Sequence, residues 1–409
     1  MRHLLRHQLV ESLLLALAAA EAGVRILSPR ERPIKSAPVD IHSYFSDAEI
    51  ERGARYARPQ MALALARAAV EVGALAAIVR RPPRWLNGGN RSPVPGGAVT
   101  GAGMAIALSL PPLPLSAIAR RRGMAVGLVT QSWRGWAVDL LKGEAIEAAL
   151  AGGAGAGVVA LTRRYPRRWW LPASIGSVVL GAVLATVAPV VLDPVFNDFT
   201  PLPEGETRSD VLELARAAGV KVGEVYSVDA SRRTTAANAY VAGLGPTKRV
   251  VLFDTLLDRY SRDEVRVVVA HELAHVRNRD VLRGVAFAAL VAPAATLAVQ
   301  QLSWELSPER GTPGALPALA LAAGLVAAPT GLIGNRLSRT IERRSDAYSL
   351  TLTGAPRAFI SFERAIAVQN VADLEPPRWL TSLLATHPPT AERIAAAVSY
   401  SSTDGSSGS

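Results

Sequence analysis

The chain has 409 residues, of which 49% are hydrophobic and only 19% are charged, and its hydrophobic residues are clumped into long runs. This composition is unusual for a soluble protein of this length and is typical of a polytopic membrane protein. The formal net charge is +11 and there is no cysteine, which excludes a disulfide framework and a thiolate metal site.

The positive charge could also suggest a nucleic-acid-binding membrane protein. The arginines, however, cluster between the apolar runs, and there is little aromatic interleaving for stacking on bases. Charge that flanks membrane-spanning helices is the better interpretation. We therefore expect the lipid bilayer as a partner and no nucleic acid.

Apolar runs long enough to cross a membrane divide the chain. They cover residues 9–27, 61–79, 98–118, 144–161, 171–192, 282–302 and 316–333. Basic Arg2 and Arg6 precede the first run, as in a signal peptide. Glu11, Glu21 and Arg25 interrupt that run and no clear cleavage site follows it, so we interpret it as a retained span whose polar residues face protein. The fourth run is rich in Gly and Ala, which predicts a face for close helix packing.

The polar segments after the fifth and seventh runs predict a small α+β domain built in two parts. We expect a short amphipathic helix at 207–218, a strand at 222–228 and a hairpin from 239–242 and 249–253. The expected division is 1–192 for transmembrane helices one to five with their loops, 193–281 for the first part of the domain, 282–335 for helices six and seven, 336–400 for the second part, and 401–409 for a low-complexity disordered tail.

Residues 271–275 carry the pattern H-E-x-x-H, with His271, Glu272 and His275. On a helix the two histidines leave the same face and can share one metal ion, while Glu272 can address a water on that ion. Ser261 followed by Glu264 predicts a capping box at the start of this helix, which we expect to run on into the sixth apolar run. The motif is short enough to occur by chance, and a third ligand has to come from elsewhere.

The segment NRLSRTIERRSDAYSL, after the seventh run, supplies the candidate third ligand. Glu342 and Asp346 are four residues apart on a predicted helix and therefore share a face. The alternative is a solvated charge pair beside Arg343 and Arg344. With seven spans, residues before span six and after span seven lie on the same side of the membrane. Glu342 can therefore converge with the two histidines.

Basic residues predict which side of the membrane that is, because cytoplasmic loops are enriched in Lys and Arg. The loops on the side of the metal motif hold Arg30, Arg32, Lys35, Arg52, Arg55, Arg58, Arg120, Arg121, Arg122, Arg134 and Lys142. The other side holds fewer, with RRYPRRWW at 163–170 as the exception. We therefore expect the metal site to face the cytoplasm.

Taken together, these segments resemble the integral-membrane CAAX prenyl proteases, which are zinc endopeptidases of the gluzincin type. The resemblance covers most of residues 45–395 and rests on HELAH, SRTIERRSD, PVFNDFTPLPEGE, NAYVAGLGPTKRVVLFDTLL, GLVTQSWRGWAVDLLKG and THPPTAERI. It implies a mainly α-helical fold with about seven transmembrane helices enclosing a water-filled chamber. The zinc site would lie in a small α+β protease domain at its cytoplasmic end.

The resemblance also implies roles for individual residues. The expected ligands of one Zn²⁺ ion are His271, His275 and Glu342. Glu272 is the expected general base, and Asn238 and His387 are expected to hold the substrate backbone or the oxyanion. The composition and the shorter N-terminal region favour a bacterial relative in the plasma membrane, which leaves the peptide or membrane-protein substrate and its lipidation open.

The chemistry follows from the residue types. A zinc-bound water has a pKa near ~7, and Glu272 would take its proton as the water attacks a peptide carbonyl. His387 is a candidate donor to the developing oxyanion, or alternatively a cap of the helix at 390–397. Asp280 and Asp346 either orient the histidines or are solvated.

Two further alternatives stay open at this point. Residues 241–244 are either an edge strand that pairs with an extended peptide or part of an ordinary hairpin. The whole chain could be a membrane transporter or scaffold with an incidental or structural HExxH, in which Glu11, Glu21 and Glu71 would be pathway residues. The sequence does not address the oligomeric state.

Overall fold

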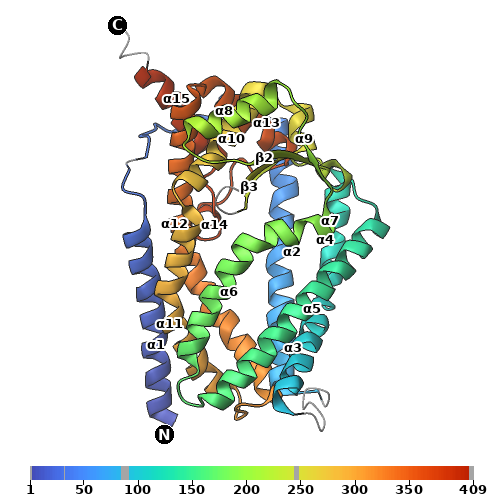
Figure 1. Cartoon of the computed structure of the whole chain (residues 1–409), viewed down its shortest axis with the longest axis vertical. Helices are drawn as coiled ribbons and strands as arrows, with labels where there is room; N and C mark the ends of the chain where they lie inside the picture. The colour runs from blue at the N-terminus through green and yellow to red at the C-terminus, as the bar shows by residue number, and fades with distance from the viewer. Residues whose placement is uncertain (1, 32, 84–91, 244–247, 405–409) are drawn as a thin grey trace.

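The computed structural model describes residues 2–31, 33–83, 92–243 and 248–404. Long helices run along the long axis of the molecule, and a small sheet with shorter helices covers one end (Figure 1). The long helices, with the shorter α4, are α1 (Arg2–Leu27), α2 (Asp47–Arg80), α3 (Pro93–Ser109), α4 (Leu113–Ala125), α5 (Trp133–Arg164), α6 (Trp170–Val191), α11 (Asp280–Leu306) and α12 (Leu316–Thr353). The expected mainly helical fold with a small α+β part is confirmed.

Among the described residues, five helices are long and apolar enough to cross a membrane, namely α2, α5, α6, α11 and α12 with the turn before it. A sixth span results if α3 and α4, which are bent by 50° at their junction, count together. Pro111 and Pro112 stand at this junction, and proline cannot continue a helix because it lacks the backbone N–H. The run at 98–118 is therefore broken. Helix α1 is not among the five but packs along α11 and α12, so the count of seven stays a prediction, as does the chamber.

Helices α3 and α5 approach each other through glycines. A Cβ atom on Gly97 would lie 2.8 Å from the carbonyl oxygen of Gly155, and one on Gly101 would lie 2.2 Å from that of Ala151. Only a residue without a side chain fits at these two positions. This contact confirms the packing face expected for the Gly- and Ala-rich run.

The sheet has four strands in the order β1-β2-β4-β3. They are β1 (Phe199–Pro201), β2 (Glu224–Val228), β3 (Ala239–Ala242) and β4 (Arg249–Phe253). Strand β4 is parallel to β2 and antiparallel to β3, and β1 is antiparallel to β2. The expected strand and hairpin are confirmed, whereas the hairpin turn at 244–247 lies outside the described residues.

Shorter helices surround the sheet. They are α7 (Asp193–Phe196), α8 (Glu206–Ala217), α9 (Asp254–Arg259), α10 (Arg262–Arg277), α13 (Pro356–Gln369), α14 (Arg378–Leu383) and α15 (Thr390–Asp404), with 3-10 turns η1 (Ile41–Ser43) and η3 (Ala230–Arg232). A third 3-10 turn, η5 (Pro313–Ala315), directly precedes α12 at the other end of the molecule. Val225 and Val250 of the sheet pack with Leu256 and Leu273 in a fully buried core. This core fixes α10 against the sheet.

Two expectations about helix ends are wrong. The helix that carries the HExxH motif does not run on into the next apolar run, because α10 ends at Arg277 and α11 begins at Asp280. Arg279 between them has φ 55, a left-handed conformation that ends the helix. The expected tail is also partly ordered: residues 401–404 belong to α15, and 405–409 lie outside the described residues.

Candidate metal centre

Helix α10 begins with the capping box that the sequence predicts. The Ser261 hydroxyl accepts from the backbone N–H of Glu264 at 3.4 Å, and the Ser261 N–H donates to the Glu264 carboxylate at 2.8 Å. The helix then continues unbroken through the motif, so His271 and His275 project from one face.

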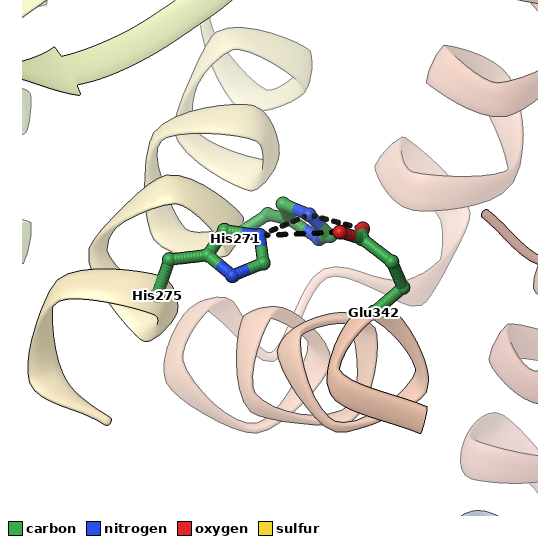
Figure 2. A group of neighbouring side chains, drawn as sticks. All are labelled: His271, His275 and Glu342. Carbon is green, nitrogen blue, oxygen red and sulfur yellow. Dashed lines mark hydrogen bonds and ion pairs between the residues drawn. The ribbon is translucent and has the colours of Figure 1, made fainter. Parts of the chain in front are cut away.

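Both histidines meet a carboxylate from α12. The Nε2 atoms of His271 and His275 are 3.1 Å apart. Glu342 places Oε2 at 3.2 Å from Nε2 of His271 and Oε1 at 3.7 Å from Nε2 of His275. Figure 2 shows the three side chains pointing toward one another from α10 and α12, and one potential ligand atom from each lies within 4.8 Å of the others.

Two further carboxylates orient the imidazoles. Asp346 Oδ1 lies 2.9 Å from Nδ1 of His271, and Asp280 Oδ2 lies 3.0 Å from Nδ1 of His275. A carboxylate at this distance favours the tautomer with the proton on Nδ1. Both Nε2 lone pairs then face the same point beside Glu342. Asp280 and Asp346 therefore contact the histidines and are not solvated, which were the two alternatives that the sequence left open.

The donor set fits a divalent metal ion. Tetrahedral zinc with bonds of about 2.0–2.1 Å separates its ligand atoms by roughly 3.4 Å, close to the distances among these three side chains. The local charge also favours a cation. Burial opposes a charge on His271, but Asp346 and Glu342 outweigh burial and raise the pKa of His271 to about 10.

Asp346 also belongs to a buried ionic chain, which runs from Asp346 through Arg393 to Glu363. Arg393 of α15 donates to Asp346 at 2.6 and 2.9 Å and lies 2.7 Å from Glu363 of α13. Glu363 is only 2% exposed, and burial raises its pKa to about 7. On the other side, Arg344 donates to Asp280 at 2.5 and 2.6 Å.

Sequence reasoning missed Arg393, Glu363 and Arg344 as parts of the site. The one available signal for Arg393 was its place in the segment THPPTAERI. Glu363 gives no signal, since a single Glu in an amphipathic helix is ordinarily solvated. Arg344 looked like part of a solvated basic cluster, whereas it is 8% exposed.

A cavity of about 540 Å³ opens beside the metal ligands and brings the remaining candidates together. Its lining includes Glu272, Asn238 and His387. Burial raises the pKa of Glu272. Nε2 of His387 lies 3.5 Å from Oε2 of Glu342, and the His387 side chain is 62% exposed. Oδ1 of Asn238 accepts from the N–H of Ala239 at 2.9 Å, which fixes its amide at the start of β3.

Two sequence models of known families match the chain. The model of peptidase family M48 matches residues 201–401, and that of the CAAX prenyl protease N-terminal region, with five membrane helices, matches residues 32–198. The chain belongs to peptidase family M48. The M48 segment contains all three candidate metal ligands, and the second model makes this member of the family an integral membrane protein. The resemblance stated from the sequence is confirmed.

Similar proteins include a bacterial metalloprotease and a yeast CAAX prenyl protease. An uncharacterized metalloprotease, YhfN of Bacillus subtilis (strain 168), is 32% identical over 57% of this chain and 57% of its own length. CAAX prenyl protease 1 of Saccharomyces cerevisiae is 32% identical over 38% of this chain and 34% of its own length. The chain thus spans about half or less of the length of these relatives.

The fold is shared over almost the whole chain with a solved structure. The crystal structure of S. mikatae Ste24p superposes with a TM-score of 0.76 and covers 96% of this chain and 98% of that protein. The sequence identity is 21%, so this likeness establishes the arrangement of helices and sheet.

Proposed function

We propose that this M48 protein is a membrane-embedded zinc endopeptidase that binds one Zn²⁺ ion through His271, His275 and Glu342. The observation that carries the proposal is the meeting of these three side chains beside a cavity that also exposes Glu272. Zinc, when bound, supplies a Lewis acid that polarises a carbonyl and lowers the pKa of a water ligand. A transporter or scaffold is not favoured, because it gives no reason for the oriented ligand set.

Three other side chains that line the cavity have roles in the proposed reaction. Glu272 accepts the proton of the attacking water and returns it to the leaving amine, and its buried position keeps its basicity above that of a solvated carboxylate. His387 donates to the oxyanion from its position beside Glu342. Asn238, held by its contact with Ala239, donates its amide N–H to the substrate backbone.

Strand β3 is the candidate platform for the substrate. It pairs with β4 on one side and is the last strand of the sheet among the described residues, so its other edge can pair with an extended peptide. Asn238 immediately precedes β3 and lines the cavity. A peptide added to this edge would therefore run into the metal centre.

We further propose that the substrates are membrane-associated peptides, including CAAX-like ones. The CAAX prenyl proteases among the relatives and the membrane helices support this class. We place the metal centre on the cytoplasmic side of a bacterial plasma membrane, which the basic residues in the loops at that end support. The division at residues 192, 281 and 335 into membrane and protease parts belongs to the same proposal.

Substitution of the base tests the reaction. Glu272→Gln keeps the volume of the side chain but cannot accept a proton, so we expect unchanged zinc content and loss of peptide cleavage. Glu213→Gln, which alters an exposed carboxylate on α8, is the matched control and should cleave normally. Cleavage by Glu272→Gln at the rate of the control would overturn the assignment. Comparing one peptide with and without a prenyl group then tests the CAAX-like class.

Orientation can be tested with single cysteines, because the chain contains none. Ser209→Cys lies on α8 at the sheet end, and Pro308→Cys lies in the connection between α11 and α12 at the other end. In intact cells an impermeant thiol reagent should label the cysteine at 308 and spare the one at 209. The reverse pattern would place the metal centre outside.

A further inference from the structure

The segment RRYPRRWW at 163–170 is the exception to the rule that the basic loops lie on the side of the metal motif. Residues of this segment form one wall of a second cavity. This cavity has a volume of about 480 Å³ and lies where the α5–α6 connection meets the α11–α12 connection. Figure 1 shows both connections at the end of the helix bundle that is opposite the sheet. The cavity is therefore separate from the metal centre.

Guanidinium groups from the two chain segments at this end of the bundle line the cavity. Arg163 comes from the last turn of α5, Arg167 from the α5–α6 connection and Arg310 from the α11–α12 connection. Among the described residues, no carboxylate lies within ion-pair distance of these three arginines. Arg310 donates to the carbonyls of Ser307 and Trp304 at 2.6 and 3.2 Å, which holds it in place and leaves its charge without a counterion.

One acidic side chain also lines the cavity and has to be counted. Glu309 accepts from the hydroxyl of Thr312 at 2.7 Å, so part of its hydrogen-bonding capacity is used within its own loop. The balance of the lining is still positive. By contrast, arginines near the sheet are neutralised by acids: Arg58 lies 2.8 Å from Asp373, and Arg233 lies 2.8 Å from Asp139.

The rest of the lining suits the head of a lipid. Trp169, which is 5% exposed, Trp304, Ala315 and Leu319 supply aromatic and apolar surface, as expected where a helix bundle meets the membrane interface. Helix α6 begins directly after the arginines, and its first turns expose Leu171 and Ile175 at 48% and 62%. Acyl chains can lie along such a surface.

We propose that this cavity binds the phosphodiester headgroup of an anionic phospholipid. Arginine forks recognise phosphate oxygens in pairs. The dipole at the end of α5 accounts for some preference for arginine at 163 and 164. It does not account for the convergence of Arg163 and Arg167 with Arg310 from a different connection. The site does not depend on the proposed peptidase activity.

The same segment provides a matched control. Arg164 and Arg168 belong to the same turn but do not line the cavity, and the guanidinium of Arg164 lies 5.1 Å from the ring centre of Tyr165. Arg163→Gln/Arg167→Gln and Arg164→Gln/Arg168→Gln therefore remove equal charge from one loop. Only the first pair removes it from the cavity.

The purified full chain is exchanged into nanodiscs of phosphatidylcholine with or without phosphatidylglycerol of the same acyl chains. Retained lipid is measured by native mass spectrometry and stability by melting temperature. We expect wild type and the control pair to retain phosphatidylglycerol selectively and to melt higher with it. The cavity pair should lose roughly tenfold or more of this preference, as for lost hydrogen bonds to a charged group. Unchanged zinc content in both pairs verifies folding.

Several results would overturn the proposal. Equal losses in the two pairs would show a general effect of surface charge, and equal retention of both lipids by wild type would remove the anionic preference. If a variant does not fold, the retention of the two lipids by the wild-type protein still tests the proposal. Inorganic phosphate that raises the melting temperature in phosphatidylcholine alone as much as phosphatidylglycerol does would replace the lipid by a free anion. Competition by an acidic peptide, with no lipid retained, would replace it by a protein partner.

Discussion

The strongest quantitative expectation concerns Asp346→Asn. Asp346 Oδ1 lies 2.9 Å from Nδ1 of His271, and the replacement keeps the shape of the side chain while removing its charge. The imidazole then loses the anionic partner that fixes its tautomer and raises its basicity as a ligand. Loss of such a partner typically weakens metal binding about 10–100-fold, or roughly 1.4–2.7 kcal/mol.

The effect on folding should be much smaller than the effect on zinc affinity. Arg393 is shared between Asp346 and Glu363, so in Asp346→Asn it retains Glu363 at 2.7 Å. Arg393→Met should instead lower the stability of the fold, because it removes the cation that Asp346 and Glu363 share. Breaking a buried ion pair from one side costs about 3–5 kcal/mol of folding free energy.

The assay measures two quantities on each preparation. Zinc affinity is obtained by chelator competition, and stability is obtained by melting the metal-free protein in detergent. Asp258→Asn, an exposed carboxylate on α9, is the control for a lost charge. Wild-type zinc affinity in Asp346→Asn would refute the reasoning about tautomer and basicity. An Arg393→Met protein as stable as the control would refute the role of the buried ionic chain.

Three shorter predictions concern Glu342, His387 and Asp210. Glu342→Ala should lose most of its zinc, because two imidazoles alone leave the metal half-coordinated, and undiminished zinc by elemental analysis would exclude Glu342 as the third ligand. His387→Ala should keep zinc and melting temperature while kcat falls by ~10²-fold or more; a near-normal kcat would exclude the oxyanion role. A hydrogen bond from Arg262 lowers the pKa of Asp210 below its ordinary value of 3.8, so this pair stabilises the fold above that pH and loses its effect as pH falls through the lowered pKa. The difference in melting temperature between wild type and Asp210→Asn should therefore shrink below pH 3.8, and a constant difference would contradict the assignment.

Helix α10, which carries the HExxH motif, could be predicted from the sequence because its signals are local. Ser261 and Glu264 mark its start, and the spacing of His271 and His275 fixes their common face without any tertiary information. Glu342 is 67 positions after His275 by residue number (342 − 275), and its selection required the count of membrane spans. In the structure Glu342 lies 3.2 Å from His271, because α11 and α12 return the chain to the sheet end of the molecule.

The buried ionic chain could not be predicted in this way. Arg393 and Asp346 are separated by 47 residues, and Glu363 lies on yet another helix. Each of these residues has an ordinary exposed alternative on an amphipathic helix. Only the packing of α15 against α12 and α13 removes them from water and forces them to pair.

The break between α10 and α11 is a second feature that could not be predicted from the sequence. The run VRNRD has no glycine or proline, yet Arg279 adopts φ 55 and ψ 45. An L-residue there costs about 1–2 kcal/mol, and the turn brings Asp280 to 3.0 Å from Nδ1 of His275.

If the backbone turn is what matters, Arg279→Gly should keep zinc affinity and raise the free energy of unfolding by roughly 0.5–1 kcal/mol. This is the relieved strain less the added entropy of the unfolded chain. Arg279→Pro fixes φ near −65° and should weaken zinc binding and stability together. Chelator competition and thermal melting measure both effects. A glycine variant with weakened zinc binding would mean that the Arg279 side chain, rather than the backbone turn, positions Asp280.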